Sequence, residues 1–336
     1  MKDATHSTPL SLCRYLPRRV ATNHLPIADR CSADEACCSA YRPEQSVFQL
    51  EGFDVQRIAD FIYAHPNGFT NLVDLPYRLT SWSLQDARNV RIWESAGQIR
   101  AVGMVQLPWL ALDYACATEA LVPEVFAWGA ERASAIARER GDEFWLGIYI
   151  SPHNAAHSAY AKALGFQLDD EWAQIHLERD LNPHLPAVDL PDGFTFRPMG
   201  GQVDAYVELH QTAFGSKNMR VDWRARTLTA PEYRPELDLF IVDAADRPVA
   251  FSIGWLHDDK GQIEPLGVHP DYQRLGLGRA VLLEGLRRLG VAGATRAHIH
   301  VYKHNDPALA LYQLPDNGNF RPEYELSAYV RAFTML

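Results

Sequence analysis

Beyond residue 42, apolar and polar positions follow a regular pattern that predicts helices and strands. An amphipathic helix is predicted over 53–62, and two strands over 89–94 and 99–107 are joined by a turn at 95–98. The elements predicted next are a strand at 110–116, a helix at 122–140, a strand at 144–150, a helix at 154–164 and a strand starting at 175–177. Gly165 is expected to end the helix at 154–164 in the left-handed conformation.

The same order of elements returns in the second half of the chain, so the sequence contains an internal repeat. The elements predicted there are a strand at 194–198, helices at 203–214 and 221–229, a hairpin at 239–243 and 249–257, a strand at 263–268, a helix at 279–289, a strand at 297–302, a helix at 305–315 and a strand at 324–333. Three prolines between the halves favour extended backbone. We therefore expect an irregular leader at 1–42, a first domain at 43–181, a linker at 182–193 and a second domain at 194–336.

The second half contains a strand, a glycine-bearing turn and a helix in direct succession. The strand Ile263–Val268 is broken by Pro270, and Gln273-Arg274-Leu275-Gly276-Leu277-Gly278 leads into the helix. Glycines at the start of a helix let unpaired backbone N–H groups converge at its positive end, which predicts an anion cradle. The turn lacks the Gly-Lys-Ser/Thr of a P-loop and the third glycine of a dinucleotide fingerprint.

This turn resembles the acetyl-CoA motif Q/R-x-x-G-x-G/A of the GNAT superfamily of N-acetyltransferases. The element order of both halves is similar to that family as well, over roughly residues 45–180 and 194–336. The resemblance implies an α/β fold class with a mixed sheet, built as two GNAT (acyl-CoA N-acyltransferase) domains in tandem. It also implies that the parallel strands at 263–268 and 297–302 splay apart and that acetyl-CoA binds between them. The tandem arrangement looks like that of mycothiol synthase, and several other two-domain GNAT proteins share it.

The last helix of the family has a signature that only the second half retains. Asn305, Ala308 and Tyr312 stand at the family's spacing, although the following Gly-Phe pair comes late, which predicts a longer loop. In the first half Ala161 occupies the position of the tyrosine. The residues after the strand at 110–116 include Glu119 and no glycine before 129, and a carboxylate there repels a phosphate. We therefore expect the first half to be a degenerate GNAT domain that serves as scaffold or cleft wall.

The resemblance assigns catalytic and cofactor-binding roles. Glu264, a polar residue in an apolar strand, is the candidate base, directly or through water, and Tyr312 is the candidate acid for the leaving thiolate. The alternatives are a solvated edge glutamate and a tyrosine that only packs in the core. Pro265 cannot donate to a ladder and should mark a bulge or splay. The predicted acetyl-CoA contacts are Leu266, Val268, Gln273, Arg274, Leu275, Gly276, Leu277, Gly278, Arg279 and Asn305.

The acceptor site is less well defined by sequence. His298 and His300 share one face of their strand, where they could line the acceptor pocket or transfer protons, or be histidines satisfied beneath a helix. Trp255 is a further candidate for the acceptor pocket, and Phe214 and Trp223 could also reach it.

Composition narrows the classes of partner. The net charge of −10 argues against nucleic acid and suits a cationic amine, and no apolar run approaches the ~20 residues of a membrane span. The spacing of the five cysteines fits no zinc motif, so we expect no metal, and reduced thiols in the cytoplasm.

The favoured function is acetyl transfer from acetyl-CoA to a primary amine of a small molecule. The alternative is a non-catalytic acyl-CoA-binding or regulatory module. The acceptor, the acyl chain length and the oligomeric state, a homodimer included, stay open.

Overall fold

The computed structural model describes residues 53–181, 185 and 187–335, so the predicted leader at 1–42 lies outside the described residues. The helices are α1 (Phe53–Ala64), α2 (Leu75–Leu79), α3 (Val122–Arg140), α4 (His157–Ala163), α5 (Val203–Phe214), α6 (Val221–Thr227), α7 (Leu277–Val291) and α8 (Asp306–Gln313). The strands are β1 (Val90–Ser95), β2 (Gln98–Gln106), β3 (Ala111–Cys116), β4 (Phe144–Ile150), β5 (Gln167–Leu168), β6 (Gln174–Asp180), β7 (Thr195–Pro198), β8 (Asp238–Val242), β9 (Pro248–His257), β10 (Lys260–Val268), β11 (Arg296–Tyr302) and β12 (Arg321–Phe333). The predicted order of elements is confirmed, whereas α2 and β5 were not expected.

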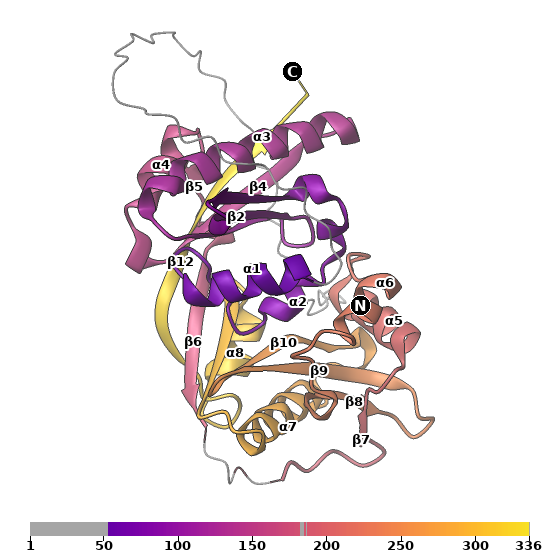
Figure 1. Cartoon of the computed structure of the whole chain (residues 1–336). Helices are drawn as coiled ribbons and strands as arrows, with labels where there is room; N and C mark the ends of the chain where they lie inside the picture. Colours follow the sequence, from indigo (N-terminus) through magenta and orange to yellow (C-terminus); the bar gives the residue numbers. More distant parts are fainter. Residues whose placement is uncertain (1–52, 182–184, 186, 336) are drawn as a thin grey trace, which may run out of the picture.

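All the strands join one mixed sheet in the order β1-β2-β3-β4-β12-β6-β11-β10-β9-β8-β7, and β5 pairs with β12. The long strand β12 connects the two halves, as Figure 1 shows, because its first part pairs with β6 and its last part with β4. β6 precedes the proline-rich linker yet pairs along its whole length with β11, which follows the linker. The two halves therefore exchange strands. The domain boundary at 182–193 divides the segments by their order along the chain, and it remains a prediction.

Helices cover both faces of the sheet in each half (Figure 1). In the first half α3 packs on one face and α1 with α2 on the other, and each side has its own buried apolar cluster. In the second half α7 packs against β9 and β10, while α5 packs on the opposite face beside α6. Among the described residues, no helix is both long and apolar enough to cross a membrane.

The two halves meet through aromatic side chains. Tyr77 of α2 belongs to the apolar cluster of the second half, where its ring stacks on Trp223 at a centroid distance of 4.8 Å. The Trp223 indole N–H donates to the Tyr77 carbonyl at 3.3 Å, and Trp109 contacts Trp223 edge to face. These contacts hold α2 and the loop that carries Trp109 over the sheet of the second half, where the candidate site lies.

Gly165 has the expected role at the end of α4. Its φ is +80°, and the N–H groups of Gly165 and Phe166 donate back to the carbonyls of Lys162 and Ala161. Only glycine adopts this conformation without a steric penalty.

Candidate functional site

The predicted splay between the parallel strands is present. β10 and β11 pair only at Lys260–Arg296, Gly261–Ala297 and Gln262–His298, and the ladder ends there. Pro265 stands just beyond, after a cis peptide bond with Glu264, and the register between β10 and β9 shifts over the same residues. A proline has no N–H to continue a ladder, so the sequence itself opens the sheet at this point.

The glycine turn leads directly into α7. Gly276 has φ of +83° and is the N-cap residue, a left-handed conformation that favours glycine. Arg274 also has a positive φ, of +62°, so two residues of this turn are left-handed. The Leu275 side chain is exposed, whereas that of Leu277 is buried, so Leu277 offers only its backbone to a ligand.

Gly278 shows that the start of α7 leaves room for a ligand. A Cβ at Gly278 would make only ordinary contacts, at 3.5 Å to Val268 and 3.8 Å to Leu311. Packing inside the protein therefore does not require a glycine here, whereas a phosphate close to the backbone does. Since Val268 ends β10 and Leu311 belongs to α8, the helix start faces the gap between these two elements. Gln273 donates to the Val268 carbonyl and Arg279 to the Asp316 carbonyl, at 3.4 Å and 2.6 Å.

A cavity of about 520 Å³ opens at the splay and is lined by both halves of the chain. Glu264, Leu266, His300, Asn305 and Tyr312 line it from the second half, so the structure brings both predicted catalytic residues to one place. Much of its remaining wall is aromatic, with Tyr77, Trp82 and Trp109 from the first half and Phe214 and Trp223 from the second.

Glu264 lies in this cavity with its side chain partly exposed. Burial raises the pKa of its carboxyl to about 8; the charge of Asp74 adds to the rise and that of Arg78 opposes it. A carboxyl with a pKa near neutral can accept a proton from an ammonium group and release it again. Burial, and then the charge of Glu264, raise the pKa of the Tyr312 phenol, so Tyr312 retains its proton at neutral pH. Asn305 caps α8 by accepting from the Ala308 N–H at 3.2 Å.

Comparison with known proteins supports this geometry. Residues 203–314 match the model of the acetyltransferase (GNAT) family. This stretch, one third of the chain, is similar to a GNAT acetyltransferase domain. Mycothiol acetyltransferase of Thermomonospora curvata is 33% identical over 135 residues, covering 38% of this chain and 46% of that protein. The Acidothermus cellulolyticus mycothiol acetyltransferase is 28% identical over 250 residues, covering 67% and 75%. This chain covers only 46% and 61% of the length of the first two such relatives.

Solved structures support the fold of both halves of the chain. A GCN5-related N-acetyltransferase from Sphaerobacter thermophilus matches with a TM-score of 0.58 and 18% identity, covering 83% of this chain and 92% of that one. A tandem GNAT protein from the clavulanic acid biosynthesis pathway matches with a TM-score of 0.55 and 13% identity, covering 83% and 94%. Both matches span the two halves, so the fold is that of a tandem GNAT protein.

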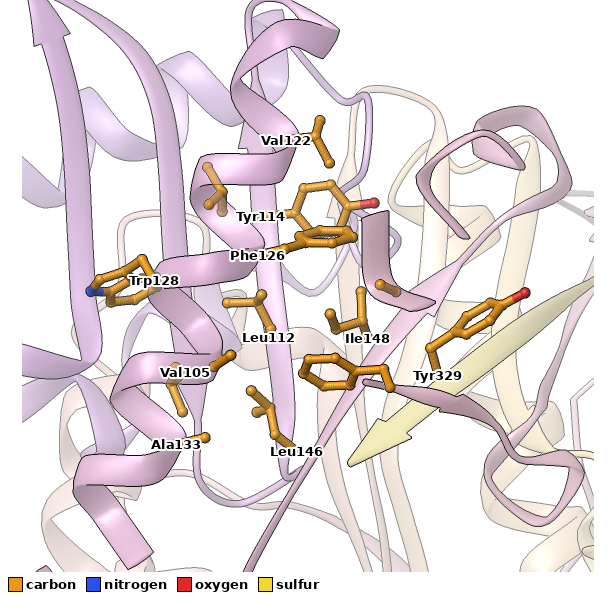
Figure 2. Close-up of a cluster of buried hydrophobic side chains, with 14 of the residues drawn as sticks. Val105, Leu112, Tyr114, Val122, Phe126, Trp128, Ala133, Leu146, Ile148 and Tyr329 are labelled. Carbon is orange, nitrogen blue, oxygen red and sulfur yellow. The ribbon is translucent and has the colours of Figure 1, made fainter. Parts of the chain in front are cut away.

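In the first half of this tandem fold the parallel strands separate as well, but side chains fill the space between them. β3 and β4 pair in parallel only at Ala111–Gly147. The space beyond is filled by Tyr114, whose hydroxyl bonds to Nδ1 of His157 at 2.8 Å, and by Phe126, which packs edge to face on Tyr114 (Figure 2). Glu124 in the first turn of α3 accepts from the Trp93 indole at 2.8 Å. Within the described residues, the protein's own side chains thus occupy the space that corresponds to the cavity of the second half.

Sequence reasoning missed a buried group of charges at the cavity wall. The Arg78 guanidinium contacts Asp74 and Asp113, each at 3.2 Å, and lies 4.5 Å from the centre of the Trp109 ring. Burial raises the pKa of Asp74 to about 6 and raises that of Asp113, while Arg78 opposes both shifts. Asp113 could have been found, since it is a polar residue in an apolar strand, the same signal that selected Glu264.

Two of the three predicted acceptor residues lie elsewhere. Trp255 is 1% exposed and donates from its indole to the Glu264 carbonyl at 2.7 Å, so it supports the β10 backbone behind the cavity. His298 is also outside the cavity lining and contacts His176 and Glu178 of β6. His300 does line the cavity, and its Nε2 is 2.8 Å from Nδ1 of His176. The strand exchange explains the difference, because β6 supplies partners that the sequence places in the other half.

Proposed function

We propose that this chain is an acetyl-CoA-dependent N-acetyltransferase that acetylates a primary amine of a small molecule bound in the cavity between the two halves. One observation carries the proposal: Glu264 and Tyr312 line the same cavity, at the point where β10 leaves β11. Base and acid therefore flank the opening through which a thioester would approach. The family match and the likeness to tandem GNAT structures support the same reading.

The catalytic sequence assigns one task to each group. Glu264 takes a proton from the acceptor ammonium, directly or through a water molecule, and leaves a neutral amine that attacks the thioester carbon. A backbone N–H of Leu266 or Val268, beyond the splay, donates to the oxygen on which charge develops. The C–S bond then breaks, Tyr312 gives its proton to the departing CoA thiolate, and the nitrogen of the new amide loses its second proton to solvent.

Acetyl-CoA fits the groups around the glycine turn. Backbone N–H groups of the first turn of α7 would meet the pyrophosphate at the positive end of the helix, and the open position at Gly278 leaves room for its approach. Asn305 lines the cavity at the start of α8, where the pantetheine arm would pass. The filled splay of the first half supports a single cofactor site per chain.

The charges of the cavity favour a cationic acceptor. Glu264 lines it, and Asp74 and Asp113 are bound to Arg78 at its wall, so three carboxyl groups accompany the two guanidinium groups of Arg78 and Arg140. Because two of the relatives above are named mycothiol acetyltransferases, the unacetylated amine form of mycothiol is the first acceptor to test.

A thiol-release assay with acetyl-CoA and a panel of amines tests the proposal. The panel should contain the amine form of mycothiol, amino sugars, cysteinyl compounds and polyamines. Turnover with a primary amine, lost when that amine is methylated to a quaternary ammonium, is the expected result. Tight acetyl-CoA binding without turnover of any amine would instead favour the non-catalytic acyl-CoA-binding module.

A further inference from the structure

Four ionisable side chains meet on one face of the sheet where the halves exchange strands. In the antiparallel pair β6–β11, His176 lies opposite His300 and Glu178 opposite His298. Side chains two residues apart on a strand share a face, so the four form a block of two adjacent rungs. Only His300 of this block lines the acceptor cavity.

Three atoms of the block form a nearly equilateral triangle. Nδ1 of His298 lies 3.1 Å from Nε2 of His176 and 3.1 Å from Oε1 of Glu178, and the last two atoms are 3.2 Å apart. An ion placed about 2.05 Å from each atom, a usual distance for zinc, would see them at angles of about 100°. That angle lies between the tetrahedral and octahedral values, so the triangle can serve as one face of either polyhedron.

Hydrogen bonds alone cannot satisfy this triangle. If both imidazoles carry a proton here, the two N–H groups face each other. If only one does, a lone pair faces another lone pair. With Glu178 ionised, every arrangement of protons on the two imidazoles therefore leaves one of the three contacts unfavourable, whereas a cation at the centre is bound favourably by all three atoms.

We propose that His176, His298 and Glu178 bind a divalent transition-metal ion, with zinc as the metal of first choice. Two imidazoles and one carboxylate suit zinc and its neighbours rather than magnesium or calcium, which prefer oxygen ligands. The expectation of no metal rested on the spacing of cysteines, and this set contains none. The proposal is independent of acetyl transfer.

The surroundings orient His176 in the way expected at a metal centre, whereas Nε2 of His298 is buried without a hydrogen-bond partner among the described residues. His176 is held by stacking on Tyr324, with ring centres 4.5 Å apart and planes 8° from parallel. Its second nitrogen, Nδ1, is 2.8 Å from Nε2 of His300, a partner of the kind that orients metal-bound histidines. A surface hollow of about 350 Å³ reaches Glu178 of the triangle. Its lining also contains the carboxylates of Asp180 and Glu323 and the guanidinium groups of Arg179, Arg296 and Arg321.

A metal at this place would connect the two halves and the acceptor cavity. The ligands on β6 precede the linker and the ligand on β11 follows it, so the ion would fasten the strand exchange. With the metal on Nε2 of His176, the proton of that ring stands on Nδ1 and is donated to Nε2 of His300. His300 then carries its own proton on Nδ1, an atom that is buried without a hydrogen-bond partner among the described residues.

Metal titration of the full chain tests the proposal. Protein freed of metal by dialysis against a chelator is titrated with Zn²⁺ by calorimetry and with Co²⁺ by absorption spectroscopy. One equivalent per chain is expected at the triangle. Glu178→Gln and His298→Ala should each lower the affinity for the metal ion. The loss should exceed the roughly 10–100-fold that follows when a residue bonded to a metal ligand is removed. His304→Ala, which removes a half-exposed histidine paired with Asp170 elsewhere, should bind as wild type does.

The readout must separate this site from the four cysteines in the first 38 residues. Cobalt bound by thiolates shows sulfur-to-metal charge transfer, whereas nitrogen and oxygen ligands do not. X-ray absorption of zinc-loaded wild type reads the ligand set without any substitution, so the test survives if a variant fails to fold. Two imidazoles with oxygen neighbours are expected. Absence of binding, thiolate ligands only, or affinity unchanged in both variants would overturn the proposal.

Discussion

Replacing Glu264 by glutamine tests the central chemical assignment. Glutamine keeps the shape of the side chain and cannot accept the amine proton. The structure gives a specific reason to expect a pH signature, because burial, with the charge of Asp74, raises the pKa of Glu264 to about 8. The substitution should therefore change both the pH dependence of activity and the pH dependence of stability, and the two can be measured independently.

The activity of wild type should rise with pH through about 8. With that pKa, roughly one-tenth of Glu264 is ionised at pH 7, so kcat/KM should increase about tenfold per pH unit below 8 and level off above. Glu264→Gln should remove this limb and lower kcat/KM by ~10²–10⁴-fold. The acceptor amine also titrates, so the profile is repeated with acceptors of different basicity, and only the limb that stays fixed belongs to the enzyme.

A fixed limb near pH 8 that survives in the glutamine variant would refute the assignment of Glu264. His300 would not explain such a limb, because burial and then the neighbouring His176 hold the pKa of His300 well below its ordinary value. Another group of the cavity would then have to be the base.

The stability measurement needs no knowledge of the acceptor. The folded pKa of Glu264 lies above the unfolded value of 4.5, so between pH ~5 and ~8 the folded protein holds a proton that the unfolded chain has released. The unfolding free energy contributed by this group falls as pH rises, by at most ~1.4 kcal/mol per pH unit, and solvent reaching the cavity reduces that slope. Urea unfolding at pH 5, 6, 7 and 8 should show a shallower decline in Glu264→Gln than in wild type. Parallel declines would show that Glu264 is ordinarily solvated.

Three further substitutions test the other parts of the site. Tyr312→Phe retains the ring and should lower kcat by ~10²–10⁴-fold with acetyl-CoA affinity preserved; turnover at the wild-type rate in steady-state assays would mean that the acid is another group. Gly278→Glu should abolish most acetyl-CoA binding in calorimetry, where wild type shows one site per chain. The control Gly201→Glu places its side chain in open space and should leave acetyl-CoA binding unchanged. Equal loss of binding in both variants would indicate general damage to the fold. Arg78→Met leaves two buried aspartates without their cation and should lower the unfolding free energy at pH 8 by ~3–5 kcal/mol. That loss should shrink toward pH 4 as the aspartates become protonated, and the exposed Arg88→Met should behave as wild type at both pH values.

The sequence by itself determined the elements and the backbone of the glycine turn and of the splay. Periodicity predicted the order of helices and strands in both halves, because each element buries one face and its pattern is local. Gly276 indicated the left-handed turn, and Pro265 the end of the ladder, since each residue fixes its own backbone geometry. The family resemblance selected Glu264, a polar residue in an apolar strand, and Tyr312, at the family's spacing from Asn305, and both line one cavity.

Only the tertiary structure decided what surrounds those residues. The pairing of β6 with β11 brings His176 beside His298, 122 residues away, and no local pattern specifies such a partner. In the same way the fold places α2 over the second half, so that Arg78 and its aspartates reach the cavity. Strand register and the docking of helices depend on the burial of surfaces contributed by distant segments. The acceptor cavity and the proposed metal site are therefore properties of the assembled sheet and of neither half alone.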